Sequence, residues 1–352
     1  MTTQPAAHAD PRLSQLRDWL ATQSSAFGID PGSLRPASAD ASFRRYFRVD
    51  CGQAEQRSLI VMDAPPEREP VAPFVKVAQM LLEAGLNAPR VLAGDEAAGF
   101  LLLTDLGTTT YLQALLECQR QNDAVGAHTL MIEAIDALLR WQAASRPGVL
   151  PAYDAALLRR ELDLFPDWYV ARHLQHTLTE AQRASLERTF ETVLAANLAQ
   201  ASVFVHRDYM PRNLMLGHSN PGILDFQDAV YGPIAYDIAS LLRDAFISWD
   251  EARLIDWTAV YWERARAARL PVPADFGQFW RDVEWMGLQR HLKVLGIFAR
   301  INYRDGKPSY LADTPRFVKY VRDVACRYDE LAPLAHLLDQ LAGITPQYAV
   351  SF

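Results

Sequence analysis

Cysteine is scarce in this sequence, and its spacing excludes two kinds of site. The chain of 352 residues has three cysteines, Cys51, Cys118 and Cys326, which lie far apart. An odd number without C-x-x-C spacing argues against a disulfide framework and against a structural zinc site. The eight histidines show no paired metal-ligand spacing either. We therefore expect reduced cysteines and a cytoplasmic protein.

Excess positive charge and long apolar runs are missing as well. Lys and Arg number 35 against 42 Asp and Glu, a net charge of −7, and half of the residues are hydrophobic. Without a basic stripe, nucleic acid is not an expected partner. No run of eighteen apolar residues occurs, and the first ten residues lack the apolar stretch of a signal peptide, so no membrane span and no export signal are expected. The composition allows one large or two modest domains.

One stretch near the middle of the chain places polar residues between short apolar runs. The run Val203 to Val205 leads into His206-Arg207-Asp208, and four residues then separate Asp208 from Asn213. After a second run and a turn rich in Gly, Asn and Pro, a third run delivers Asp225. Short strands joined by such a turn are typical of a hairpin. We expect the hairpin to bring Asp208, Asn213 and Asp225 around one small volume.

The chemistry that suits this trio is phosphoryl transfer. That reaction needs an in-line nucleophile and positive charge on the phosphate oxygens, and little covalent help from the protein. The amide oxygen of Asn213 and the carboxylate of Asp225 are the hard ligands that Mg²⁺ prefers. Asp208 is left to accept the proton of an attacking hydroxyl. The spacing H-R-D-x-x-x-x-N, then a strand, then D-F, is that of the kinase catalytic set.

These residues also carry a resemblance to a known family. The segments concerned are His206 to Asn213, Leu224-Asp-Phe-Gln-Asp-Ala229 and Gly232-Pro-Ile-Ala-Tyr-Asp-Ile-Ala239. They resemble the aminoglycoside phosphotransferase and choline kinase family, a branch of the protein-kinase-like fold. Three further runs resemble bacterial anomeric kinases of cell-wall sugars: Asp63-Ala-Pro-Pro-Glu67, Thr104-Asp-Leu-Gly107 and Asp225-Phe-Gln-Asp228.

The resemblance implies an enzyme that uses ATP and Mg²⁺ to phosphorylate an alcohol group. The implied substrate is N-acetylmuramate, N-acetylglucosamine or both, phosphorylated at the anomeric hydroxyl to a sugar 1-phosphate in peptidoglycan recycling. An aminoglycoside or choline-type kinase is the alternative within the family. A catalytically inactive kinase-like protein that only binds a partner is the alternative from another class. For the enzyme we expect a monomer whose partner is a small-molecule sugar.

The order of the expected elements predicts an α+β protein with two lobes. Strand patterns dominate residues 1–107, which would form a small nucleotide-binding lobe. Helical spacing dominates residues 108–352, which would form a large lobe carrying the catalytic loop and the substrate site. ATP would lie in the cleft between them. The last helical stretch of the large lobe, Pro315 to Leu341, is expected to break at Pro333.

Two features of the kinase pattern are missing from the first lobe. No glycine occurs between Ser33 and Cys51, where a glycine-rich loop would cover the phosphates, and the strand ending in Met62-Asp63 lacks the usual lysine. The small Ser and Ala residues of this loop still allow backbone N–H groups to approach phosphate oxygens. Arg44 and Arg45 could add positive charge; the alternative is that both are solvated strand residues. The expected ATP contacts are Ser42, Phe43, Arg44, Arg45, Thr104, Asp105 and Leu106.

Other polar residues are assigned supporting or substrate roles. The resemblance implies that His206 and Asp237 are structural, with Asp237 holding the catalytic loop; a helix N-cap is the alternative for Asp237. Sugar sites combine flat aromatic faces with hydrogen-bonding side chains. On that basis the candidate substrate residues are Trp168, Tyr169, Arg172, Gln227, Asp228 and Arg304. Aromatic residues at helical spacing are also typical of a core, so that alternative stays open.

Overall fold

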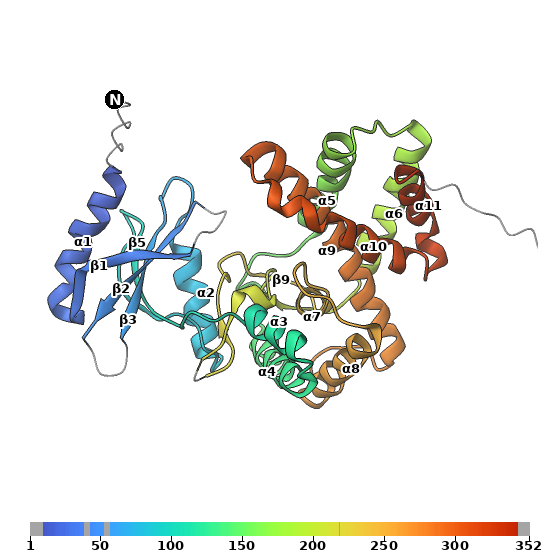
Figure 1. Ribbon diagram of the computed structural model, residues 1–352. Helices are drawn as coiled ribbons and strands as arrows, with labels where there is room; N and C mark the ends of the chain where they lie inside the picture. The colour runs from blue at the N-terminus through green and yellow to red at the C-terminus, as the bar shows by residue number, and fades with distance from the viewer. Residues whose placement is uncertain (1–9, 39–42, 53–56, 218, 344–352) are drawn as a thin grey trace, which may run out of the picture. The chain divides into compact units, whose positions relative to one another are not determined.

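The computed structural model describes residues 10–38, 43–52, 57–217 and 219–343. Its chain divides into two compact units. Unit 1 is Met1–Thr109 together with Met215–Asp228, and unit 2 is Thr110–Leu214 together with Ala229–Phe352. The first contains the main sheet and the second is mostly helical (Figure 1). The boundary predicted from the sequence lies at residue 107. That prediction assigned residues 215–228 to the second lobe, whereas in the structure they belong to unit 1.

Unit 1 is built on an antiparallel sheet of five strands in the order β1-β2-β3-β5-β4. Its strands are β1 (Ile29–Ser38), β2 (Arg45–Cys51), β3 (Ser58–Asp63), β4 (Val91–Asp95) and β5 (Phe100–Thr104). The register sets Arg45 opposite Asp63 and Leu59 opposite Thr104. Since successive side chains alternate between the faces of a sheet, this register decides which polar residues share a face.

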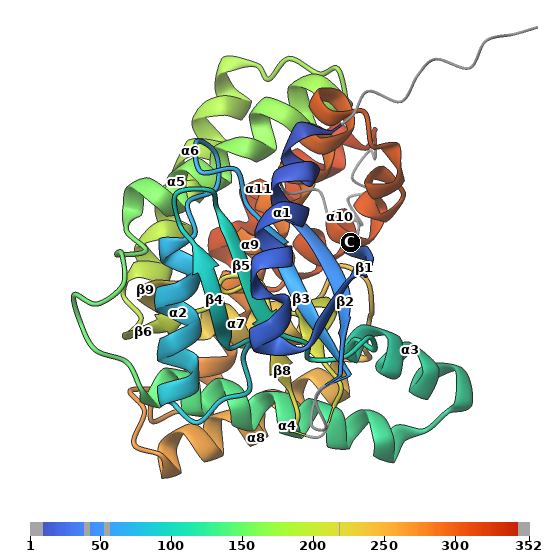
Figure 2. The same ribbon diagram turned by 90° about the vertical axis from the view of Figure 1, so that its left-hand side faces the viewer.

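One face of this sheet is covered by α1 (Pro11–Phe27), as Figure 2 shows. Leu16 and Leu20 of α1 pack on Val49, Leu59 and Val61 in a buried cluster. Asp10 caps the helix by accepting the N–H groups of residues 12 and 13. Because strand neighbours alternate, the side chains of β2 and β3 between these buried ones lie on the opposite face.

A helix and a short hairpin complete unit 1. The helix α2 (Ala72–Glu83) buries Phe74, which packs on Phe226 with 4.8 Å between ring centroids. The strands β7 (Leu214–Met215) and β8 (Gly222–Ile223) form the hairpin that the sequence predicted. Backbone hydrogen bonds from Leu216 to Thr109 and from Ile223 to Asn87 attach this hairpin to the unit.

Unit 2 is helical around one small pair of strands. Its elements are α3 (Tyr111–Gln121), α4 (Ala124–Ala143), α5 (Ala155–Leu164), the π-helix η1 (Phe165–His173), α6 (Glu180–Leu198), β6 (Ser202–Val205), the 3₁₀ turn η2 (Pro211–Asn213), β9 (Val230–Pro233), α7 (Ala235–Leu242), α8 (Glu251–Ala267), α9 (Phe276–Asp305), η3 (Pro308–Asp313), α10 (Thr314–Ala325), η4 (Asp329–Leu331) and α11 (Ala332–Leu341). The break in the last helical stretch lies at residues 326–331, just before the expected position, and Pro333 lies in the first turn of α11.

The centre of unit 2 is α9, a helix of 30 residues. It packs against η1, α5, α6, α7, α8 and α10, which is why 17 of its residues are buried. At Gly296 a Cβ atom would lie 2.4 Å from the backbone carbonyl of Leu164, so glycine is required for this close approach.

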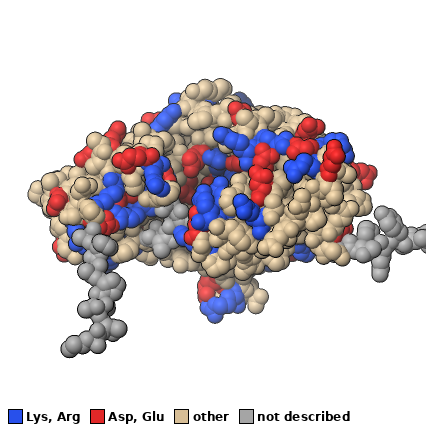
Figure 3. Space-filling model, turned by 90° about the horizontal axis from the view of Figure 1, so that it is seen from above, with Lys and Arg blue, Asp and Glu red and all other residues tan. Residues whose placement is uncertain are grey.

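Charged side chains of both signs lie next to each other on the face seen in Figure 3. This agrees with the small negative net charge of the sequence. Among the described residues, no helix has the length and apolarity to span a membrane.

Candidate functional site

The loop predicted to be catalytic follows β6, which pairs antiparallel with β9. Asp237, in the first turn of α7, is fully buried and reaches back to this loop. Its carboxylate accepts the backbone N–H groups of His206 at 2.7 Å and Arg207 at 3.0 Å. Burial raises the pKa of Asp237 to about 7, against the lowering effect of those two hydrogen bonds. The contacts make Asp237 a support of the loop backbone and not a helix cap.

This support matters because the loop contains an unfavourable backbone conformation. Arg207 has φ of +75°, in the left-handed region, which costs free energy for any residue that carries a Cβ atom. Its N–H is held by Asp237, and its guanidinium Nη2 donates to Oε1 of Glu161 at 2.7 Å. The backbone N–H and the guanidinium of Arg207 are thus both held, and this sets the direction in which the chain enters Asp208.

Asp208 and Asn213 lie in the same loop and are tied to each other. The amide Nδ2 of Asn213 donates to the backbone carbonyl of Asp208 at 2.9 Å, and the N–H of Asp208 donates to Nδ1 of His206 at 3.3 Å. Asp208 is half-buried, whereas Asn213 is buried. Because the amide nitrogen of Asn213 serves the loop, its amide oxygen is the atom that it can offer to a cation.

A buried polar network beside this loop was not foreseen from the sequence. Oε1 of Glu161 also accepts Nζ of Lys293 at 2.8 Å, and Lys293 contacts the hydroxyl of Tyr236 at 3.2 Å. Burial favours the neutral forms, but the two cations hold the pKa of Glu161 below its usual value. The pKa of Lys293 is raised despite its burial, by Tyr236 and Glu161 and to a smaller degree by Asp208. Nothing in the local sequence distinguishes Lys293 or Glu161 from surface residues of amphipathic helices.

Asp225, the third residue of the predicted trio, belongs to unit 1. It is exposed, has φ of +62° and accepts the side-chain amide of Gln227 at 2.9 Å. The neighbouring Phe226 is buried, so the turn is held by its aromatic side chain while the carboxylate faces outward. Gln227, predicted to meet substrate, thus orients Asp225; Asp228 is exposed.

The donor chemistry of these residues fits a hard cation. Among the described residues, no cluster of three His, Cys, Asp or Glu side chains forms a complete metal cage. Mg²⁺ does not need one, since it keeps several water ligands and takes one or two protein oxygens together with substrate phosphates. An oriented amide oxygen on Asn213 and an exposed carboxylate on Asp225 are donors of that kind.

The two arginines predicted to face ATP have different surroundings. Arg45 bonds Asp63 at 2.8 Å and also pairs with Asp10, on the face of the sheet covered by α1. Asp63 is fully buried, so Arg45 has a structural role there. Arg44 pairs with Glu69, just before α2, at 2.8 Å. Ser42 lies outside the described residues.

The other residues predicted to contact the nucleotide lie just before β2 or at the end of β5, the two strands that flank β3. Met62, at the position of the missing lysine, is fully buried. Phe43 is exposed and lies 4.4 Å from the guanidinium of Arg68. Thr104 ends β5, and the carboxylate of Asp105 is bound by Arg48 and Ser58. The side chain of Asp105 therefore serves the protein, and only its backbone remains for a ligand.

The predicted substrate residues of unit 2 do not form one group. Tyr169 is buried and stacks on Phe165 with 5.6 Å between ring centroids, and Trp168 packs against the same apolar cluster. Arg172 is exposed, and Arg304 is exposed and pairs with Asp305 at 2.7 Å. The sequence pattern that suggested a sugar-binding face is, for Tyr169, that of the core.

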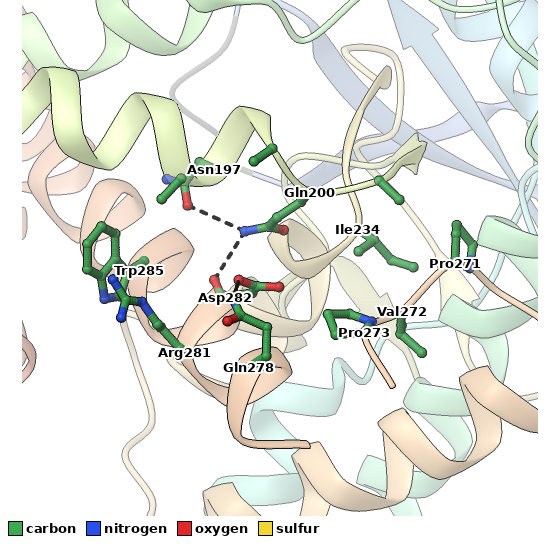
Figure 4. Close-up of a pocket in the computed structure, with 13 residues that line it drawn as sticks. Asn197, Gln200, Ile234, Pro271, Val272, Pro273, Gln278, Arg281, Asp282 and Trp285 are labelled. Carbon is green, nitrogen blue, oxygen red and sulfur yellow. Dashed lines mark hydrogen bonds between the residues drawn. The ribbon is translucent and has the colours of Figure 1, made fainter. Parts of the chain in front are cut away.

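A cavity of about 520 Å³ lies elsewhere in unit 2, between the end of α6, the loop at residues 271–273 and α9 (Figure 4). Gln200 crosses it, donating to Oδ1 of Asn197 and to the carbonyl of Asp282, each at 3.4 Å. Gln200 also accepts the N–H of Ala235 at the start of α7. The residues that line this cavity include none of the predicted site residues.

Comparisons with known proteins identify the family of this chain. The chain matches the phosphotransferase enzyme family over residues 33–272. It is 51% identical over 94% of its length to the N-acetylmuramate/N-acetylglucosamine kinase of Pseudomonas putida, covering 97% of that protein. It is also 51% identical, over 94% of its length, to the protein of the same name in Neisseria meningitidis, covering 96% of it.

Solved structures show the fold. A choline/ethanolamine kinase family protein from Mesorhizobium loti is similar with a TM-score of 0.59 and 13% identity, over 94% of this chain and 99% of that one. An aminoglycoside phosphotransferase with bound ADP is similar with a TM-score of 0.55 and 14% identity, over 88% and 98%. The predicted α+β, protein-kinase-like fold is confirmed.

Proposed function

We propose that this chain, which belongs to the phosphotransferase enzyme family, transfers the γ-phosphoryl group of ATP to the anomeric hydroxyl of N-acetylmuramate, N-acetylglucosamine or both. The observation that carries the proposal is that the chain is 51% identical, over 94% of its length, to relatives named as kinases of these two sugars. The product would be a sugar 1-phosphate, which suits the reuse of cell-wall sugars in peptidoglycan recycling.

In this proposal Asp208 is the general base. A base must be held within hydrogen-bond reach of the hydroxyl that it deprotonates. The contacts of its loop with Asp237 and Asn213 support that role, because they fix the backbone on both sides of Asp208. The anomeric hydroxyl is the most acidic hydroxyl of the sugar, so its proton needs to move only late in a loose transition state.

Asn213 and Asp225 are the proposed ligands of Mg²⁺. When bound, the ion would neutralise phosphate charge and orient the phosphate oxygens. Gln227 supports this assignment, because its amide holds one oxygen of Asp225 and so fixes the carboxylate. The buried Phe226 limits the movement of the same turn.

The nucleotide is assigned to residues of unit 1. We assign the base to the backbone of Thr104, Asp105 and Leu106, and the phosphates to the loop that ends in Phe43 and Arg44. Glu69 holds the guanidinium of Arg44, and a cation held by a carboxylate beside a helix is the arrangement that kinases make with their strand lysine. Arg45 is left out of the assignment because Asp63 and Asp10 bind it.

The test is a substrate panel. Purified protein with ATP and Mg²⁺ is given N-acetylmuramate, N-acetylglucosamine, kanamycin or choline, and phosphorus NMR identifies any product. We expect sugar phosphate with one or both amino sugars. Phosphorylation of kanamycin or choline alone would establish the alternative within the family, and ATP binding without any transfer would establish an inactive kinase-like protein.

A further inference from the structure

A partly buried ion pair joins the sheet of unit 1 to the segment Thr104–Gly107. Nε and Nη2 of Arg48, on β2, donate to the two carboxylate oxygens of Asp105 at 2.5 and 3.0 Å. Ser58, on β3, adds a hydrogen bond to Oδ2 of Asp105 at 2.7 Å. The side chains of Arg48 and Asp105 are only 17% and 8% exposed, so solvent weakens this pair less than a surface pair.

The same arginine also holds the turn that follows. Nη2 of Arg48 donates to the carbonyl of Gly107 at 2.8 Å, and the N–H of Gly107 donates to Oδ1 of Asp105 at 2.9 Å. Gly107 has φ of +106°, a conformation that favours glycine. Arg48 therefore closes a ring of hydrogen bonds around residues 105–107.

These bonds use the whole acceptor capacity of the Asp105 carboxylate. A carboxylate has about four lone-pair positions, two on each oxygen. Oδ1 accepts from Arg48 and Gly107, and Oδ2 accepts from Arg48 and Ser58. Although burial opposes ionisation, these donors hold the pKa of Asp105 below its usual value. A nucleotide finds no open acceptor on this side chain.

The other end of the segment is fixed from the neighbouring strand. The N–H of Thr104 donates to the carbonyl of Arg90 at 3.0 Å, and the N–H of Arg90 donates to Oγ1 of Thr104 at 2.9 Å. Between these fixed points lies Leu106, whose backbone N–H and C=O make no hydrogen bond within the part of the chain that the structure describes. One unpaired donor and one unpaired acceptor in a held backbone suit the edge of a purine base.

We propose that Arg48 is a positioning residue for nucleotide binding, acting through Asp105 to hold the backbone of Leu106 in the form that binds the base. The inference rests on the proposed function, which assigns the base to this segment. Arg48 acts without a contact to ATP in this proposal, because its Nε and Nη2 are bound to Asp105 and Gly107.

The test compares Arg48→Ala with a matched control, Arg35→Ala. Arg35 lies opposite Arg48 in the strand pairing and lines the same cavity of about 390 Å³, but its partner Asp50 is exposed. With Arg48→Ala we expect the calorimetric Kd and the KM for ATP to rise about tenfold, the equivalent of one charge-assisted hydrogen bond. The KM for the sugar and kcat should change less than about twofold, and Arg35→Ala should match the parent.

A second variant keeps the test decisive if Arg48→Ala does not fold. Arg48→Lys keeps a cation beside Asp105 but cannot bind both carboxylate oxygens and Gly107 together. We expect parent-like melting and a Kd for ATP raised at least about threefold. Parent-like ATP affinity in the folded variants overturns the inference, as does an equal loss in kcat and in both KM values. A parent protein that binds no ATP overturns the proposed function as well, so the two failures are distinguishable.

Discussion

Asp208 is fixed through its backbone, by hydrogen bonds that do not involve its carboxylate. The substitution Asp208→Asn keeps the shape of the side chain and removes its basicity. We therefore expect kcat to fall about 10²–10⁴-fold, the usual contribution of a general base, while calorimetry shows ATP affinity close to that of the parent. Turnover near the parent level would remove Asp208 from the role of base.

Arg44 and Arg45 are adjacent, but their partners predict opposite effects. Arg44→Ala removes the cation assigned to the phosphates, so we expect the KM for ATP to rise about tenfold. Arg45→Ala leaves the buried Asp63 with Arg12 alone, so we expect a lower melting temperature and an ATP KM within about twofold of the parent. Steady-state kinetics and thermal unfolding of both variants check this; the reverse pattern would exchange the two roles.

Among single residues, the sequence could point to candidate site residues only where their spacing along the chain gives a signal. The trio Asp208, Asn213 and Asp225 follows from fixed intervals along the chain. The partners of Arg45 and Glu161 do not, because Asp10 and Asp63 lie far from Arg45, and Lys293 lies far from Glu161, in the sequence. Which charges meet across a fold depends on packing that no local pattern records.

Among the elements, α9 brings a buried histidine against α7 and α10. His291 is fully buried, and its Nε2 lies 3.0 Å from the carbonyl of Arg243, just after α7. The rings of Phe317 and Tyr320 on α10 lie 5.4 and 5.0 Å away. Burial, with smaller effects from the charges of Arg243 and Arg290, lowers the pKa of His291 to about 3. The folded protein therefore keeps this imidazole neutral in mild acid.

The consequence is a loss of stability as the pH falls. Between about pH 6.5 and about pH 3 the unfolded chain binds a proton at His291 that the folded chain does not, so the free energy of unfolding decreases toward acid. At pH 5 this amounts to about 2 kcal/mol. We expect His291→Gln to unfold with a shallower dependence on pH in denaturant titrations between pH 5 and 7. The exposed His336→Gln is the control, and identical slopes in all three proteins would contradict the assignment.

Elements were predictable where periodicity alone decides them. The strands β3, β4 and β5 and the amphipathic helices follow their hydrophobic spacing. Strand β1 does not, because it contains two prolines and a glycine, which the sequence pattern reads as a break. The π-helix Phe165–His173 does not, because an apolar stripe does not reveal which carbonyl each N–H will bond. The break expected at Pro333 occurs a few residues earlier, at residues 326–331, since proline is tolerated in the first turn of a helix and Pro333 lies in the first turn of α11.

For the whole molecule, the division of the chain depends on contacts between distant segments. Residues 215–228 belong to unit 1 because their hairpin bonds the backbones of Asn87 and Thr109. A single boundary along the sequence cannot assign a later segment of the chain to the first unit. The same segment carries Asp225, which therefore belongs to unit 1, whereas Asn213 belongs to unit 2.

In the proposed reaction the phosphoryl group goes to the anomeric hydroxyl of an amino sugar. The most direct measurement supplies N-acetylmuramate and its 1-O-methyl glycoside side by side, with ATP and Mg²⁺, and follows the products by phosphorus NMR. The glycoside has no anomeric hydroxyl, so we expect a sugar 1-phosphate from the free sugar and no product from the blocked one. Equal phosphorylation of both compounds would place the reaction at another hydroxyl and contradict the account.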